Sequence, residues 1–288
     1  MTIGELYRLG RRQLAQAGNE SPEFDCACMI EKLWNLDRQG LLLHGNEPAE
    51  PQKEAEFRNM IEERAGHRPL QYLLGSWPFM EMELAVGEGV LSPREDTEVV
   101  VRAAAGLLKN SQKPLYGMDL CGGTGAVALG LCSLLPHLHM DSVEWLEDAF
   151  SYLEKNTGRF GDGRVTPVRG DVLNPQTPAL LCREPLDVLI SNPPYIASGE
   201  LPGLQEEVQR EPQTALDGGG DGLVFYRAIA QFWVPTVKPG GVVALEIGEE
   251  QAQDVCALLE KAGVIELCVH QDLGGLDRAI TGKRTQVR

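Results

Sequence analysis

The segment "SNPPY", residues 191 to 195, combines residue types that could act on an amino group. It follows the apolar run "LDVLIS", and each proline removes a backbone donor and fixes φ, so a strand must end here. The Asn192 side-chain oxygen and the carbonyl oxygens of Pro193 and Pro194 are then left as acceptors. Such acceptors suit an NH2 group whose lone pair is delocalised, as in an amide or an aromatic amine. Tyr195 adds a flat face that would hold a planar group in register.

This acceptor cluster predicts a particular chemistry. When both hydrogens of a planar NH2 group are bound, the nitrogen is drawn toward a tetrahedral shape and its lone pair becomes available for attack. The electrophile would be a methyl group on a sulfonium, displaced in line, so catalysis would rest on positioning and electrostatics. No nucleophilic side chain is required. We therefore expect Asn192, Pro193, Pro194 and Tyr195 to be the catalytic residues, acting on either an adenine or an amide.

A glycine-rich turn, "CGGTG", follows the strand-like run "LYGMDL" and precedes an apolar helical pattern. Glycines at such a turn let the backbone bend tightly and approach a ligand, whose polar end then meets the free N–H groups of the helix start. A turn of this kind can also serve packing alone. The candidate cofactor residues in this region are Asp119, Cys121, Gly122, Gly123, Thr124 and Gly125.

Two acidic residues follow the glycine turn at the ends of later strands. Glu144 comes nineteen residues after Gly125, and a carboxylate at this spacing could accept both hydroxyl hydrogens of a ribose. Asp171 in "RGDVL" could accept a hydrogen bond from an adenine amino group. Taken singly, each would be a solvated or turn acid, but in this order they favour a nucleoside-containing cofactor. Because the phosphate-binding Lys-Ser/Thr pair is absent and the net charge is −16, we expect a cofactor without phosphates, such as S-adenosylmethionine.

The elements that must position these residues alternate from about Arg94 onward. Strands are predicted at 115–120, 140–146, 165–170, 186–191 and 240–248, and helices at 96–108, 126–135, 148–156 and 225–234. This alternation is typical of an α/β fold with a doubly wound, mostly parallel sheet. In such sheets ligands bind at the carboxyl ends of the strands, where the glycine turn and "SNPPY" both lie.

The N-terminal part has helical punctuation instead. Ser21 and Pro22 read as an N-cap followed by proline at the first helical position, and a second helix is predicted to begin near Pro51. Between "RPLQYLLGSWPF" and "MELAVGEGVLSPRED" the short apolar runs broken by Gly and Pro predict a β-hairpin. We expect a helical domain at 1–68, a hairpin linker at 69–93 and the sheet domain at 94–288.

Composition narrows the class of protein further. Hydrophobic residues make up 43% and charged residues 24% of the 288, as in soluble globular proteins, and no window reaches the roughly 20 apolar residues of a membrane helix. Without such a helix we expect a cytoplasmic protein with no membrane partner. The seven cysteines are scattered without metal-ligand spacing, so we expect a reducing compartment and no metal. The charge of −16 argues against a nucleic acid partner, because it would repel a polyanion.

Several segments together resemble a known family. "DLCGGTGAVAL", "VEWLEDAF", "RGDVL" and "SNPPYI" look like the successive motifs of class I S-adenosylmethionine-dependent methyltransferases that act on amino groups. "RPLQYLLGSWPF", "LSPREDTE", "EEVQREPQTALDGGGDGLVFYRAI" and "DLGGLDRAI" resemble one branch, the release factor glutamine methyltransferases, called HemK or PrmC. The likeness covers nearly the whole chain and is weakest over the first 65 residues.

The resemblance implies a small N-terminal helical domain that docks the substrate and a seven-stranded, Rossmann-like methyltransferase domain. It implies methylation of the glutamine side-chain amide in the Gly-Gly-Gln loop of class-1 peptide chain release factors, which tunes translation termination. S-adenosylmethionine would be the cofactor and S-adenosylhomocysteine its product. By position, the family's cofactor turn falls on residues 121–125, its ribose acid on Glu144, its adenine-side pair on Asp171 and Val172, and its amide clamp on residues 192–195. Asn192 of the clamp is also expected to contact the cofactor.

Two departures from the family pattern are visible. Cys121 stands where the family usually has glycine, and Glu144 where it usually has aspartate. A cysteine there could crowd the methionine end of the cofactor or require a backbone conformation that other residues disfavour. Cofactor affinity is therefore the property that this sequence puts most in question.

Two alternatives stay open at this point. Adenine-N6 DNA methyltransferases share the Asn-Pro-Pro-Tyr clamp, although they must also extrude a base and hold a polyanion. The second alternative is a protein that binds a release factor or a nucleoside without efficient catalysis, because Cys121 disrupts its cofactor turn. The loop from Ile196 to Gly222 is expected to cover the substrate, while its acids Glu206, Glu207 and Glu211 read equally well as solvated surface.

Overall fold

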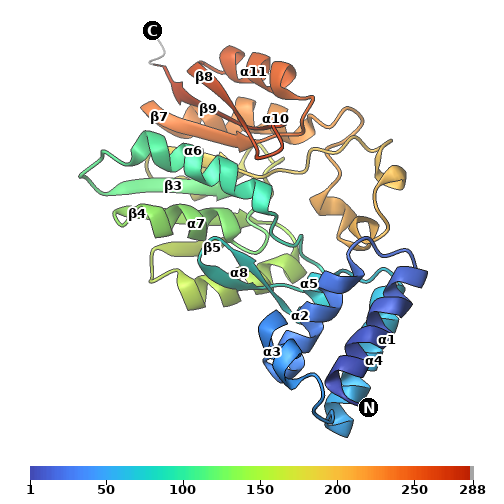
Figure 1. The fold of residues 1–288 in the computed structure, drawn as a ribbon. Coiled ribbons are helices and arrows are strands. Elements are labelled where there is room, and N and C mark those ends of the chain that lie inside the picture. The colour runs from blue at the N-terminus through green and yellow to red at the C-terminus, as the bar shows by residue number, and fades with distance from the viewer. Residues whose placement is uncertain (286–288) are drawn as a thin grey trace. The chain divides into compact units, whose positions relative to one another are not determined.

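A computed structural model of the chain describes residues 1–285 (Figure 1). Over these residues the chain divides into two compact units. The first takes in Met1–Ser76 and Gln205–Glu211, and the second takes in Trp77–Leu204 and the chain from Pro212 onward. Among the helices of residues 1–285, none combines the length and the apolar character that crossing a membrane requires.

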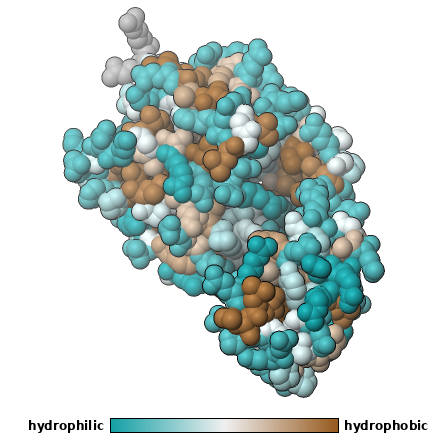
Figure 2. Space-filling view, viewed as in Figure 1, coloured by the Kyte–Doolittle hydropathy of each residue, from teal (hydrophilic) through white to brown (hydrophobic). Residues whose placement is uncertain are grey.

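The first unit is helical. Its helices are α1 Ile3–Gln16, α2 Pro22–Trp34, α3 Arg38–His44, α4 Pro51–Ala65 and α5 Leu70–Leu74. Pro22 and Pro51 lie in the first turns of α2 and α4, where proline costs no helical hydrogen bond. The sequence indicated both of these starts but gave no separate signal for α3 or α5. Figure 2 shows an apolar patch over α3, where Leu42 and Leu43 are 85% and 79% exposed.

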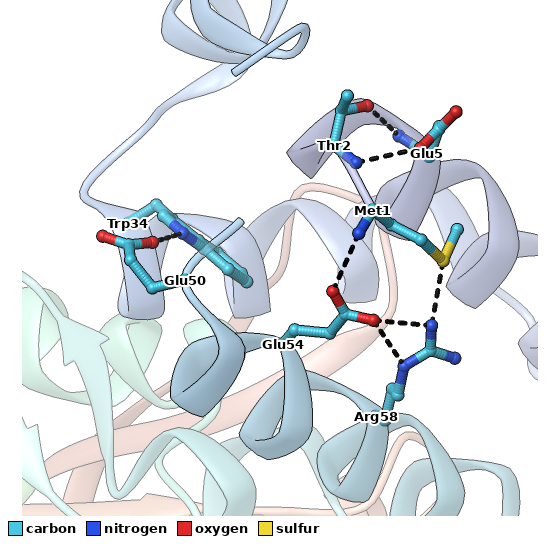
Figure 3. A network of polar contacts seen from close by, with 7 residues as sticks. All are labelled: Met1, Thr2, Glu5, Trp34, Glu50, Glu54 and Arg58. Carbon is cyan, nitrogen blue, oxygen red and sulfur yellow. Dashed lines mark hydrogen bonds and ion pairs between the residues drawn. The ribbon is translucent and has the colours of Figure 1, made fainter. Parts of the chain in front are cut away.

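Polar contacts fix the start of α1 and the end of α2 to α4 (Figure 3). The Met1 amino group donates to Glu54 Oε2 at 3.1 Å, and Arg58 donates to Glu54 Oε1 at 2.8 Å. Trp34 Nε1 donates to Glu50 Oε2 at 2.6 Å. These contacts lie near the surface, so each adds little to stability, and the buried apolar faces of α1, α2 and α4 hold the unit together.

The segment Gln205–Glu211 belongs to this helical unit although it lies far along the chain. Arg64 Nη2 pairs with Glu207 Oε2 at 2.5 Å, and His67 Nε2 lies 3.1 Å from Glu206 Oε2. Of the acids that the sequence left between a substrate cover and solvated surface, Glu207 therefore forms an ion pair at the end of α4, and Glu206 contacts His67 just beyond it.

The second unit is built on a mixed sheet. Within residues 1–285 its seven strands are β3 Leu115–Leu120, β4 Leu138–Glu144, β5 Val165–Arg169, β6 Leu186–Ser191, β7 Val237–Glu246, β8 Val264–Gln271 and β9 Asp277–Arg284. Their order is β5-β4-β3-β6-β7-β9-β8, with β9 antiparallel to both of its neighbours. The expected seven-stranded, doubly wound sheet is confirmed. A hairpin of β1 Ser76–Phe79 and β2 Met82–Ala85 forms a separate two-stranded sheet.

Helices cover both faces of the large sheet (Figure 1). They are α6 Glu98–Leu108, α7 Ala126–Leu134, α8 Glu147–Phe160, α9 Thr177–Leu181, α10 Val224–Ala228 and α11 Ala252–Lys261. Residues of α6 and α7 pack with the hairpin in one core, and residues of α10 and α11 pack in the other. Strand β6 sends Val188 and Ile190 into the first core and Leu189 into the second, as expected of a parallel strand buried on both faces.

Two expected helices are shorter than their sequence patterns suggested. The segment 96–108 begins as a 3₁₀ turn at Glu95–Thr97 and becomes α-helical only at Glu98. The segment 225–234 leaves α10 for a π-helical turn at Ile229–Trp233 and then a 3₁₀ turn at Val234–Thr236. Pro235 accounts for the second change, because it has no N–H with which to continue the α-helical pattern.

The parallel strands end together at one edge of the sheet. Leu120 pairs with Val143 on β4 and with Ser191 on β6, and Ser191 pairs with Leu245 on β7. The strand order changes direction between β3 and β6, which makes their carboxyl ends the switch point where open α/β sheets bind ligands. The glycine turn follows β3 and the Asn-Pro-Pro-Tyr turn follows β6, so the fold brings them side by side.

Candidate active site

A cavity of about 490 Å³ lies at this edge of the second unit. Nine of the residues expected in the site line it: Cys121, Gly122, Gly123, Thr124, Glu144, Asp171, Val172, Asn192 and Pro194. The other four expected residues, Asp119, Gly125, Pro193 and Tyr195, are next to lining residues in the sequence or fold but do not line the cavity themselves. The volume is in the range of pockets that hold small ligands.

Other lining residues were not expected from the sequence. They include Val90, Ser92, Pro93, Thr97, Trp145, Leu146, Thr214, Asp217 and Phe225. Ser92, Pro93 and Thr97 fall in "LSPREDTE", and Thr214, Asp217 and Phe225 fall in "EEVQREPQTALDGGGDGLVFYRAI". Both segments resemble the family, and that likeness was the signal that could have placed them in the site.

The glycine turn is held by backbone hydrogen bonds. Gly122 N donates to Val143 O at 2.8 Å, and Gly125 N donates to Gly122 O at 2.7 Å. A Cβ at Gly122 would lie 2.2 Å from Ser142 Oγ, and Gly125 has a φ of +84°, so each position requires glycine. The turn ends at the start of α7, whose free N–H groups can bind a polar or anionic group.

Cys121 adopts a backbone conformation that suits glycine. Its φ is +59°, which costs a non-glycine residue about 1 kcal/mol or more. Burial raises the pKa of its thiol well above the usual value, and the nearby Glu144 and Asp119 raise it further. The sulfur therefore stays neutral at physiological pH and acts as bulk at the cavity wall rather than as a nucleophile.

Glu144 is tied to backbone N–H groups at the end of β4. Its Oε2 accepts from Gly123 N at 2.9 Å, and its Oε1 accepts from Trp145 N and Leu146 N, both at 2.7 Å. A carboxylate has about four acceptor positions, and three are used here. The sequence suggested that this side chain could accept both hydroxyl hydrogens of a ribose. The structure leaves about one acceptor position, on Oε2, for such a contact.

Asp171 and Val172 follow β5 on the same side of the cavity. Asp171 Oδ1 accepts from Leu173 N at 2.8 Å, which fixes the carboxylate in its turn. Val172 is 4% exposed, and its carbonyl oxygen accepts from Trp233 Nε1 at 3.0 Å. These contacts give this wall an acceptor beside an apolar surface.

Asp119 is fully buried behind the glycine turn. Its Oδ2 accepts from Ser142 Oγ at 2.9 Å. Burial raises the pKa of this carboxyl to about 7, with the charge of Glu144 adding to the effect and the Ser142 hydroxyl and the Ala128 backbone opposing it. Asp119 therefore supports the turn from behind, at a distance from any ligand in the cavity.

The Asn-Pro-Pro-Tyr turn is held by side chains instead. Asn192 Nδ2 donates to Thr97 Oγ1 at 3.1 Å, which leaves its Oδ1 as an acceptor at the cavity wall. Gln251 Nε2 donates to the Tyr195 carbonyl oxygen at 2.9 Å. The Tyr195 ring packs against the second core, and its hydroxyl donates to Glu246 Oε1 at 3.4 Å. Burial raises the pKa of the Tyr195 hydroxyl, with the charge of Glu246 adding to the effect.

Metal chemistry has no recognisable donor set in the described part of the chain. Within residues 1–285, no three His, Cys, Asp or Glu side chains lie together as they would to hold a metal ion. Cys26 and Cys28, both on α2, are buried and half-buried respectively, and burial raises the pKa of each thiol to about 12 and about 11.

Comparison with known proteins bears on the family and on the fold. Residues 5–75 match the family described as the PrmC N-terminal domain. Over 72% of this chain, the fold matches that of a methyltransferase from Pyrococcus furiosus, with a TM-score of 0.51 at 15% identity over 91% of the other chain.

Relatives with assigned names match almost end to end. A release factor glutamine methyltransferase of Geobacter sulfurreducens is 35% identical over 98% of this chain and 96% of its own length. One from Moorella thermoacetica is 36% identical over 99% of this chain and 100% of its own length. The chain thus belongs to the release factor glutamine methyltransferase family, also called PrmC or HemK.

Proposed function

We propose that this protein transfers a methyl group from S-adenosylmethionine to the side-chain amide nitrogen, N5, of the glutamine in the Gly-Gly-Gln loop of class-1 peptide chain release factors. The observation that carries the proposal is the orientation of Asn192. Its Nδ2 is used by Thr97 Oγ1 at 3.1 Å, so its Oδ1 is the atom left to accept a hydrogen from a substrate NH2 group. The names of the relatives support glutamine, rather than adenine, as the bearer of that group.

The cavity suits the proposed cofactor. A Cβ built on Gly123 would extend into open space, with Val90 its nearest neighbour at 3.9 Å, so glycine leaves room there for a ligand. The glycine turn and α7 would hold the methionine end, Glu144 a ribose hydroxyl, and Asp171 with Val172 the adenine. S-adenosylmethionine supplies an electrophilic methyl group on a sulfonium.

The chain's own residues then position the amide. Asn192 Oδ1 and a carbonyl oxygen of the proline pair, of which Pro194 lines the cavity, accept the two amide hydrogens, which favours a pyramidal nitrogen with a free lone pair. The nitrogen gains the methyl group as the bond from that methyl to sulfur breaks, the neutral thioether S-adenosylhomocysteine leaves, and one proton passes to solvent, so atoms and charge balance. Catalysis here rests on orientation and electrostatics and needs no covalent intermediate with the protein. The neutral Cys121 thiol offers no competing thiolate.

The helical unit is proposed to dock the release factor. Leu42 and Leu43 on α3 form part of an exposed apolar patch, the kind of surface that proteins use for contact with one another (Figure 2). The net charge of −16 disfavours a nucleic acid at the same place. We place the reaction in the cytoplasm, where the unpaired cysteines would stay reduced.

A methyl-transfer assay tests this proposal. The purified protein is incubated with methyl-tritiated S-adenosylmethionine, a class-1 release factor and duplex DNA in one mixture. We expect label on the release factor, and none on a matched factor whose loop glutamine is changed to alanine. Mass spectrometry of the loop peptide should place the added methyl group on that glutamine.

Two outcomes would contradict the proposal. Label on the DNA and not on the factor would make the protein an adenine methyltransferase. Cofactor binding by calorimetry without any turnover would make it a binding protein whose cofactor turn is spoiled by Cys121.

A further inference from the structure

A buried carboxyl lies beneath the Asn-Pro-Pro-Tyr turn. Glu246 ends β7, the strand beside β6, and it is 2% exposed. Because Ser191 pairs with Leu245, the residues that follow these partners, Asn192 and Glu246, lie at the same edge of the sheet. Neither the cavity wall nor the methyl-transfer chemistry described above includes Glu246.

The hydrogen-bond donors around this carboxyl come from the turn and from the cavity wall. The Tyr195 hydroxyl donates to Oε1 at 3.4 Å. The Thr97 hydroxyl lies close enough to favour the charged form of the carboxyl. Among the described residues, Oε2 has no hydrogen bond of normal length and angle. The carboxyl therefore has spare acceptor capacity facing donors that are still loosely placed, as is common in ligand-free sites.

Thr97 connects this carboxyl to Asn192. Its Oγ1 accepts from Asn192 Nδ2 at 3.1 Å, and the side chain is 3% exposed, so water does not compete for it. Having accepted one hydrogen bond, the hydroxyl still has its own hydrogen to donate. A charged Glu246 is the acceptor for that hydrogen. The two hydrogen bonds then run in one direction, with Asn192 donating to Thr97 and Thr97 donating to Glu246.

The direction matters because the two ends of an asparagine amide have nearly the same size. Hydrogen-bond partners, rather than shape, decide which end faces a given neighbour. We propose that charged Glu246 is a positioning residue for methyl transfer, because it fixes Thr97 as its donor and so keeps Asn192 Oδ1, not Nδ2, turned toward the substrate amide. This inference rests on the proposed function.

Protonation of Glu246 would reverse the direction of the hydrogen bonds that join Glu246, Thr97 and Asn192. A protonated carboxyl donates to Thr97 Oγ1, and the Thr97 hydrogen then needs an acceptor, which is Asn192 Oδ1 after the amide turns over. Asn192 would present Nδ2 to the substrate, where one donor faces another. The turned-over state should bind cofactor normally but hold the glutamine amide poorly.

The groups that face Glu246 place this change near neutral pH. Burial raises the pKa of its carboxyl to about 7, and the negative charge of Asp96 acts in the same direction. Thr97, Arg278 on β9 and Tyr195 oppose that rise. Arg278 is itself paired with Asp272 at 3.0 Å, and the Tyr226 hydroxyl of α10 donates to the Glu246 backbone oxygen at 2.9 Å.

The test compares kcat against pH for methyl transfer to a release factor, at saturating cofactor and substrate. For the unaltered protein we expect kcat to fall by about tenfold per unit as the pH drops below about 7. Glu246→Gln cannot ionise, so it should lose that acid limb and have a kcat about 10- to 100-fold lower at about pH 8. The Kd for S-adenosylmethionine should stay within about threefold, because Glu246 does not line the cavity. Glu249→Gln, an exposed change three residues away, should match the unaltered protein.

Thr97 supplies a second test that does not depend on the folding of the Glu246 variant. Thr97→Val keeps the shape but removes the hydroxyl, so kcat should fall with KM for cofactor unchanged. Thr97→Ser keeps the hydroxyl and should restore most of the rate.

The outcomes separate this inference from the proposed function. An unaltered protein that methylates no release factor contradicts the function itself. If the unaltered protein is active, the proposed function stands. The inference alone is then overturned if Glu246→Gln keeps the acid limb and the kcat of the unaltered protein. The inference is also overturned if Thr97→Ser loses as much rate as Thr97→Val, since a relay through the hydroxyl predicts rescue.

Discussion

The two turns that line the cavity are held in place by different means. The glycine turn after β3 is fixed by backbone bonds, such as Gly122 N to Val143 O at 2.8 Å, and by positive φ angles. The Asn-Pro-Pro-Tyr turn after β6 has few backbone donors, because two of its residues are prolines. Side chains from other elements hold it, with Thr97 on Asn192 and Gln251 on the Tyr195 carbonyl.

This difference decides what each turn tolerates. A turn fixed by its backbone can accept a new side chain if the backbone keeps its angles, and Cys121 is such a case, with a φ of +59°. A turn fixed by side chains fails when a distant partner changes, even if its own residues are intact. We therefore expect substitutions near the glycine turn to alter stability and affinity, and substitutions near the second turn to alter rate.

A buried carboxyl behind each turn repeats the contrast. Burial raises the pKa of both Asp119 and Glu246 to about 7. Asp119 is paired with Ser142, which belongs to the sheet, whereas Glu246 faces Thr97 and Tyr195, which belong to the cavity wall and the turn. Ionisation near pH 7 should therefore change the stability of the protein at Asp119, behind the glycine turn. At Glu246, behind the Asn-Pro-Pro-Tyr turn, it should change the rate of methyl transfer.

The largest effect is expected from removing the amide of Asn192. Asn192→Ala deletes the acceptor for the substrate NH2 group, so kcat should fall by about 10²- to 10³-fold, as for other preorganised polar groups that stabilise a transition state. Cofactor affinity should stay unchanged, because the glycine turn lies on another strand. Rates from the tritium assay and Kd values from calorimetry measure the two effects separately.

Asn110→Ala is the matched control, since Asn110 is exposed and lies beyond the end of α6. It should leave both rate and affinity unaltered. If calorimetry on Asn192→Ala shows lost cofactor binding instead, Asn192 belongs to the cofactor site and the contrast between the turns breaks down.

A smaller effect, in stability, is expected at Asp119. Its pKa is raised from 3.8 to about 7 on folding, so the stability linked to its proton is fully present below about pH 3.8 and is lost as the pH rises through 7. Asp119→Asn cannot ionise and escapes that loss. The free energy of unfolding of the variant, relative to the unaltered protein, should rise by about 2 to 3 kcal/mol between about pH 5 and pH 8.

Urea unfolding at a series of pH values measures this difference. Glu246 is present in both proteins, so its own titration cancels. Asp254→Asn, an exposed change on α11, should show a difference that does not vary with pH. If the stability difference for Asp119→Asn also does not vary with pH, Asp119 is charged in the folded protein. The two buried carboxyls would then not share a raised pKa.

Local patterns were enough to predict the backbone-held part of the site. The predicted bounds of β3 and β6 agree with the structure, and the glycine turn lies between β3 and α7 as expected. Such features depend on residues close together in sequence, namely apolar runs, glycines and prolines. The doubly wound sheet followed from the alternation of strands and helices, and its seven strands from the family resemblance.

The side-chain network could not be predicted in the same way. Asn192 and Thr97 are 95 residues apart, and Tyr195 and Glu246 are 51 apart, so no local pattern links them. Tyr195 was expected to offer a flat face to the substrate. That role stays a prediction. The structure adds that the ring packs against the second core and that its hydroxyl donates to Glu246 Oε1 at 3.4 Å, a contact that no local pattern indicated.

The loop of 196–222 shows the same limit. Its acids had two interpretations in the sequence, and the structure shows Glu207 paired with Arg64 and Glu211 only 3% exposed. These contacts are made within the helical unit, to which residues 205–211 belong. Charge patterns indicate that acids are present but cannot identify a partner brought close by tertiary folding.

The smallest effects are expected at Cys121, and they separate strain from bulk. Cys121→Gly relieves a strained φ worth about 1 kcal/mol, but glycine also gains entropy in the unfolded chain, so the net stability should change by less than about 1 kcal/mol. Cys121→Ala keeps the strain and loses the buried sulfur, so it should be less stable than the unaltered protein by about 1 kcal/mol.

Affinity should follow a different rule from stability at this position. The φ of Cys121 is a property of the folded turn, and if the turn keeps its shape on binding, the strain is equal in the free and bound protein and cancels from the Kd. Only the bulk of the sulfur at the cavity wall can then change affinity, and both variants remove it, so both should bind S-adenosylmethionine at least as tightly as the unaltered protein. A clear loss of affinity in both, measured by calorimetry, would show instead that the sulfur makes a useful contact with the cofactor. A loss in Cys121→Gly alone would show that the strained residue holds the turn open for its ligand, and the backbone-held turn would then depend on a side chain after all.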